Sequence, residues 1–205
     1  MPGRSYKPGP PTIVTPAAGG GSAASPVKVY EHTFNSPYTH PYTVAPPTIS
    51  GYLTTTGWTN SQASWSGNNG IIYLPGSISP SSTITLTLNV QSGYALSITS
   101  FSALCKSQNN GYANWSMTIN GIAVGSGTVN VGNGASYSTI GGNVANAVNG
   151  LRGTVTVVIT LSNAAGNGQF RMDNFILNGY AEQLTTGTSS ATDYRYGFNG
   201  KENDN

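Results

Sequence analysis

Residues able to move a proton are scarce in residues 27–182, the part of the chain that carries strand-like patterning. Its acids are Glu31, Asp173 and, at its margin, Glu182, and its histidines are His32 and His40. Hydrolysis by paired carboxylates needs two acids within reach of one substrate bond. The sequence also has no Gly-x-Ser-x-Gly elbow, zinc-type Cys/His spacing, phosphate loop or Gly-x-Gly-x-x-Gly fingerprint. The sequence therefore argues against an enzyme, and we assign no catalytic residue.

Asp173 lies near the end of this region, in a run typical of a closing strand. The first and last strands of a jelly roll commonly lie side by side, which would bring Glu31 close to Asp173. One interpretation is a structural calcium site built from Glu31, Asp173, Asn174 and backbone carbonyls, since Ca²⁺ prefers oxygen ligands. The other is an ordinary surface ion pair of these acids with Arg171 or Lys28.

Aromatic side chains suggest a second kind of chemistry, the stacking of rings on sugar faces. Trp58 and Trp65 lie in a Gly-, Ser- and Asn-rich run, and we predict that they are displayed as ligand-binding residues. Neighbouring Asn and Gln side chains would hydrogen-bond the sugar hydroxyls. The alternative is that these rings belong to the core, as tryptophans in strands usually do. Trp115 begins an alternating strand and is predicted to be core.

The composition narrows the classes of partner. Charged residues make up 7% of the chain, against roughly 25% in a typical soluble domain. Lys106 is the only charged side chain between Pro41 and Leu151, and the net charge of +2 is scattered. Nucleic acid binding is not expected, because no basic patch alternates with aromatic residues. No apolar stretch reaches the length of a membrane helix, so no membrane insertion is expected either.

The hydrophobic pattern has a period of two, which is typical of half-buried strands. Residues 82–90 and 154–161 alternate apolar side chains with threonine or other polar ones. Asn120-Gly121 predicts a two-residue hairpin turn. The Gly- and Asn-rich stretch 142–150 is interpreted as a loop. Nine or ten short strands predict an all-β fold, a two-sheet antiparallel β-sandwich of the jelly-roll type.

Three zones follow from these patterns. Residues 1–26 are rich in Pro, Gly and Ser and are interpreted as a linker. Residues 27–182 form the predicted sandwich. Residues 183–205 return to Thr, Ser and Gly and end in a charged, aromatic cluster. Cys105 is the only cysteine, so no intramolecular disulfide can form. A charge-poor, Thr- and Ser-rich β protein is expected to be extracellular or at the cell surface.

Two resemblances add to this interpretation. The terminal run Asp193–Asp204, which contains YRYGFNGKE at 194–202, resembles the start of the RHS-repeat-associated core of the YD-repeat family. That resemblance implies a large secreted or surface-attached parent protein, such as an adhesin. The segments Val29–Asn35 and Phe170–Phe175 are similar to the first and last strands of galactose-binding-like jelly rolls and carbohydrate-binding modules. In those modules acids on these strands often hold a structural calcium, which carries over only to Glu31 and Asp173.

Two functional hypotheses remain. The first is a noncatalytic extracellular module that binds a glycan or another surface ligand. The second is a structural spacer or a self-assembling fibre module, because a surface with few charges lacks the edge charges that block strand-to-strand association.

Overall fold

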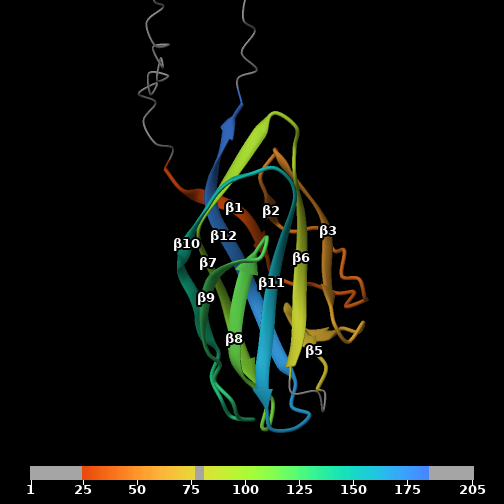
Figure 1. Ribbon diagram of the computed structural model, residues 1–205. Helices are drawn as coiled ribbons and strands as arrows, with labels where there is room; N and C mark the ends of the chain where they lie inside the picture. Colours follow the sequence, from red (N-terminus) through yellow and green to blue (C-terminus); the bar gives the residue numbers. More distant parts are fainter. Residues whose placement is uncertain (1–24, 77–80, 185–205) are drawn as a thin grey trace, which may run out of the picture.

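The computed structural model describes residues 25–76 and 81–184, and they form two antiparallel sheets packed face to face (Figure 1). The seven-stranded sheet runs in the order β10-β7-β12-β1-β2, with β5 beside β12 and β4 beside β5. The five-stranded sheet runs β3-β6-β11-β8-β9. The described residues contain no helix, so the predicted all-β sandwich is confirmed.

The strands have the following bounds: β1 Val27–His32, β2 Thr48–Ile49, β3 Leu53–Asn60, β4 Ser66–Asn68, β5 Ile71–Leu74, β6 Ser81–Val90, β7 Tyr94–Ser107, β8 Tyr112–Ile119, β9 Ile122–Thr128, β10 Ser138–Leu151, β11 Gly153–Ala164 and β12 Phe170–Gln183. No helix among the residues described is long and apolar enough to cross a membrane. The segments interpreted as linkers, 1–26 and 183–205, lie almost wholly outside the described residues, as does the run 194–202.

Strict alternation builds the five-stranded sheet. In β6 every second residue from Ser82 to Val90 is buried, and the intervening threonines face outward. β11 repeats the pattern from Val155 to Leu161. These apolar side chains pack against the inner face of the other sheet, which is how a sandwich forms its core. The predicted hairpin joins β8 to β9, with Asn120 and Gly121 at φ values of 48° and 81°.

One prediction about the sheet edge was wrong. The stretch 142–150, interpreted as a loop, belongs to the edge strand β10, which pairs with β7. Its register shifts between Asn143 and Val148, and Gly141, Gly142 and Gly150 have positive φ. An edge strand tolerates such irregular residues because only one of its sides must pair.

The first and last strands are neighbours, as expected. β1 pairs antiparallel with β12, from Val27 opposite Gly179 to His32 opposite Phe175. β12 pairs along its whole length with β7 on its other side, and its first residues also pair with β5. β12 is therefore the central strand of the larger sheet. Its outward side chains are flanked by those of β7, β1 and β5.

Candidate functional site

The two tryptophans predicted to bind ligand are not displayed. Trp58 is 1% exposed and Trp65 is 7% exposed. The Trp58 ring packs edge-on against Phe175 with centroids 4.9 Å apart, and its Nε1 donates to the Tyr30 hydroxyl at 2.9 Å. The prediction that these rings form a sugar-stacking surface was wrong. A bulge between Thr55 and Gly57 shifts the alternation of β3 so that Trp58 faces inward, and the following loop folds Trp65 against the core. The prediction that Trp115 is core was right.

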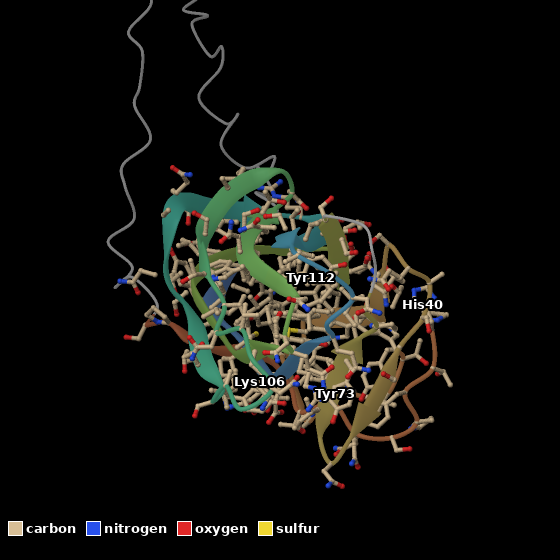
Figure 2. The ribbon with its side chains drawn as sticks, turned by 90° about the horizontal axis from the view of Figure 1, so that it is seen from below. His40, Tyr73, Lys106 and Tyr112 are labelled. Atoms are coloured by element: carbon tan, nitrogen blue, oxygen red, sulfur yellow. The ribbon has the colours of Figure 1, made fainter. Side chains whose placement is uncertain are left out.

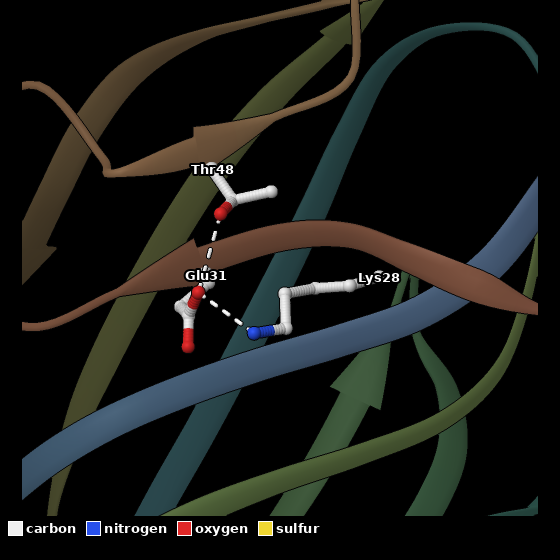
Figure 3. A network of polar contacts seen from close by, with 3 residues as sticks. All are labelled: Lys28, Glu31 and Thr48. Atoms are coloured by element: carbon white, nitrogen blue, oxygen red, sulfur yellow. Dashed lines mark hydrogen bonds and ion pairs between the residues drawn. The ribbon is translucent and has the colours of Figure 1, made fainter.

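Glu31 takes part in a local ion pair on the outer face of β1 (Figure 3). The Lys28 Nζ lies 2.8 Å from Glu31 Oε2, and the Thr48 hydroxyl donates to the same oxygen at 3.2 Å. The Lys28 contact holds the pKa of Glu31 below its usual range, with some opposition from desolvation. For Glu31, the structure therefore contains the ion pair with Lys28 that the second interpretation from sequence expected.

Asp173 and Asn174 lie at a bulge in β12, where Asn174 has a φ of 48°. Asp173 Oδ1 accepts the Asn174 N–H, and burial raises the pKa of Asp173 although that hydrogen bond opposes the rise. In the sheet register Glu31 faces Ile176, three residues along β12 from Asp173. The described part of the chain holds no group of three or more His, Cys, Asp or Glu side chains that could share a metal ion. The predicted calcium site thus stays a prediction without a formed ligand set.

The structure instead gathers four other side chains into one row across the outer face of the seven-stranded sheet. Arg171 on β12 faces Lys106 on β7 on one side and Tyr73 on β5 on the other. Tyr137 immediately precedes Ser138, which pairs with Cys105, and this places Tyr137 beside Lys106. We call Tyr137, Lys106, Arg171 and Tyr73 the cation–tyrosine row. In Figure 2 Lys106 and Tyr73 lie near each other at one side of the sandwich, whereas Tyr112 lies in its interior.

Each cation in the row lies over a ring. The Lys106 Nζ is 4.7 Å from the centroid of Tyr137, and the Arg171 Cζ is 4.5 Å from that of Tyr73. Contacts of this kind contribute roughly 0.5–1 kcal/mol at exposed sites. All four side chains are half-buried, so each keeps part of its surface available. Lys106 also donates to the Ala135 carbonyl at 3.0 Å, which fixes the position of its ammonium group.

Several polar atoms of this region have no hydrogen-bond partner. They are the Tyr137 hydroxyl, Arg171 Nε and, just beyond the row, Asn174 Oδ1. Burial raises the pKa of Tyr137, and the nearby charge of Arg171 partly offsets the rise, although no hydrogen bond of good geometry joins the two groups. A buried polar atom without a partner costs roughly 1–3 kcal/mol. Three of these atoms lie close together, beneath the exposed ends of the row.

Sequence reasoning identified Asp173 and Asn174 but missed the row beside them. Lys106 carried a usable signal, because it is the one charge in a stretch of more than a hundred otherwise uncharged residues. Its alignment with Arg171 and the two tyrosines depends on the pairing of strands that are far apart in the chain.

No family model matches the chain, and no curated protein matches it. The resemblance of residues 194–202 to the RHS-associated core therefore stays a sequence-based prediction. Among solved structures, the chain is similar to a family 29 carbohydrate-binding module, with 7% identity and a TM-score of 0.43, covering 75% of this chain and 85% of that one. It is similar also to a family 36 carbohydrate-binding module in complex with calcium and xylotriose, with 15% identity and a TM-score of 0.35, covering 58% and 98%.

A third similar structure is a family 43 arabinoxylan arabinofuranohydrolase from Bacillus subtilis in complex with cellotetraose. Its identity is 14% and its TM-score 0.39, and the match covers 62% of this chain and 25% of that one. With identities and scores at this level, the function has to be argued from the residues of the chain itself.

Proposed function

We propose that the chain is a noncatalytic glycan-binding module of an extracellular or surface protein, and that the cation–tyrosine row and the adjoining Asp173 and Asn174 form its binding face. Sugars offer apolar ring faces together with hydroxyls that both donate and accept hydrogen bonds. A surface that suits them combines aromatic rings with mixed donors and acceptors. This patch has two tyrosine rings, the donors of Lys106 and Arg171, and the acceptors of Asp173 and Asn174.

The observation that carries this proposal is the alignment of two cation–ring pairs on one half-buried sheet face, with unpartnered polar atoms beneath them. Of the five unpartnered buried side-chain atoms in the described residues, three lie in this patch. The other two, on His32 and Trp65, are enclosed in the core. The three atoms of the patch are themselves covered, but the side chains that carry them are half-buried, so the tyrosine rings and the ends of the cations remain accessible to a ligand.

The face is rigid, which favours binding without large ordering costs. Tyr73, Arg171 and Lys106 stand on three paired strands and Tyr137 immediately precedes β10, and the cation–ring contacts hold both the cations and the tyrosines in place. A preorganised surface loses less conformational entropy on binding than a loop does. The row extends across neighbouring strands, so a chain of sugars lying across the sheet would contact both rings.

Affinity gel electrophoresis of the full chain through gels containing single soluble polysaccharides tests the proposal. We expect retardation by at least one polysaccharide, and its loss in Tyr73→Ala and Tyr137→Ala. Tyr180→Ala is the matched control, because Tyr180 is a half-buried tyrosine of the same strand β12, distant from the row. Tyr137→Phe separates the ring from the hydroxyl. Unchanged retardation in both alanine variants, with folding verified by circular dichroism, would place the binding face elsewhere, and retardation by no polysaccharide would refute the function.

A further inference from the structure

The charged side chains of the sandwich are concentrated in one place. The described residues contain seven of them: Lys28, Glu31, Lys106, Arg152, Arg171, Asp173 and Glu182. Three of the seven, Lys106, Arg171 and Asp173, lie on adjacent positions of β7 and β12 on the outer face of one sheet. In a domain that otherwise hydrates its surface with Ser, Thr and Asn, this grouping calls for a specific physical reason.

The two cations of the row face each other without a counter-ion. Lys106 and Arg171 are direct partners in the antiparallel register. Like charges directly opposite each other on neighbouring strands destabilise a sheet. The one ion pair within 4.0 Å in the described part of the chain joins Lys28 to Glu31, so neither Lys106 nor Arg171 is neutralised by a carboxylate there.

Asp173 does not fill that role although it is the nearest acid. Its carboxylate turns back to accept the Asn174 N–H. Arg171 keeps only one hydrogen bond, from Nη2 to Gln169 Oε1 at a long 3.4 Å, and its Nε has no partner. The Tyr137 hydroxyl next to it is also without a partner. Within the described residues, neither cation is therefore matched by a carboxylate, and the Arg171 guanidinium makes no short hydrogen bond to an acceptor of the protein.

From this arrangement we infer that the glycan bound at the row is acidic, and that its anionic group, a carboxylate or a sulfate, binds between Lys106 and Arg171. This inference rests on the function proposed above and specifies its ligand class. An oxyanion would relieve the repulsion between the two cations and accept from Lys106 Nζ and from the Nη groups of Arg171. Guanidinium groups bind carboxylates and sulfates well because their planar donors match pairs of oxygens. The two tyrosines would then contact the sugar rings on either side.

Isothermal titration of the full chain at low salt with three polymers tests the inference. Polygalacturonate supplies carboxylates, dextran sulfate supplies sulfates, and dextran supplies neither. We expect at least one acidic polymer to bind with a Kd at least tenfold lower than that for dextran, and the binding to weaken as salt increases. The acidic polymer that binds more tightly identifies the anionic group.

Charge variants at the row provide the specific readout. Lys106→Gln and Arg171→Gln should each raise the Kd for the acidic polymer about fivefold or more, and Arg171→Lys should raise it less, because the charge is retained. Arg152→Gln is the matched control, since Arg152 is an exposed cation at the turn between β10 and β11, and it should change the Kd less than twofold. Asp173→Asn should tighten binding, because it removes the one negative charge beside the row. Melting temperatures verify that each variant is folded.

The outcomes separate the two proposals. Binding of dextran or another neutral polysaccharide as tightly as the acidic ones, lost in Tyr73→Ala, would refute the acidic ligand and leave the glycan-binding function intact. Acidic binding that Arg152→Gln weakens as much as Arg171→Gln does would indicate attraction by net charge alone and would also refute the inference. Failure to bind any of the polysaccharides, neutral or acidic, would refute the glycan-binding function itself.

Discussion

Replacing Tyr30 by phenylalanine tests how the core is assembled around the larger sheet. Tyr30 and Trp58 are 0% and 1% exposed, and the Trp58 Nε1–H donates to the Tyr30 hydroxyl at 2.9 Å. Tyr30→Phe removes the acceptor and leaves the indole N–H buried without a partner. No water can reach that group easily, because the rings of Phe34 and Phe175 pack around Trp58.

The expected cost follows from this geometry. Leaving one buried donor unsatisfied costs roughly 1–3 kcal/mol. In a domain of this size each kcal/mol lowers the melting temperature by about 2–4 °C, so the variant should melt roughly 2–12 °C below the wild type. Urea denaturation monitored by tryptophan fluorescence measures the free energy of unfolding directly. Tyr52→Phe is the matched control, because Tyr52 is half-buried and its hydroxyl makes no hydrogen bond within the described part of the protein; its effect should stay within about 0.5 kcal/mol.

A double-mutant cycle with Trp58→Phe isolates the hydrogen bond. In that background the indole N–H is absent, so Tyr30→Phe should cost about 0.5 kcal/mol or less. An equal cost in both backgrounds would mean that the hydroxyl contributes by packing and not as an acceptor. A cost below about 0.5 kcal/mol in the wild-type background would refute the reasoning altogether.

Three further predictions concern pH, backbone and metal. Burial lowers the pKa of His32 from 6.5, so the unfolded state takes up a proton before the folded state does, and stability should fall as the pH drops below about 6.5. The urea midpoints at pH 7.5 and 5.0 should therefore differ less in His32→Gln than in the wild type. An equal difference in the two proteins would contradict this. Gly57→Ala should lower the free energy of unfolding by roughly 1–3 kcal/mol in the same urea assay, because Gly57 has a φ of 93° and an added Cβ would meet the Tyr42 carbonyl. An unchanged free energy of unfolding would contradict the positive φ and the close approach at this position. Added calcium should leave the melting temperature unchanged, because Glu31 is already paired with Lys28, and a rise would restore the calcium interpretation.

The sequence by itself determined the fold class, because side-chain alternation is a local property. In the threonine-rich strands β6 and β11, the alternation of apolar and polar residues predicts which side chains are buried and which are exposed. The turn at Asn120-Gly121 can be predicted from those two neighbouring residues alone. Even the pairing of β1 with β12 could be expected, because first and last strands of a jelly roll commonly meet.

The tertiary structure alone decided which polar and aromatic side chains share a surface. Trp58 and Trp65 lie in a stretch whose small, polar residues suggest exposure, yet inter-sheet packing buries both. Lys106 and Arg171 are separated by sixty-four residues in the printed sequence and become neighbours only through the register of β7 against β12. Register is fixed by all the side chains that two strands bury together. A one-residue slip of β12 would turn Arg171 inward, and the four side chains of the row would no longer be aligned.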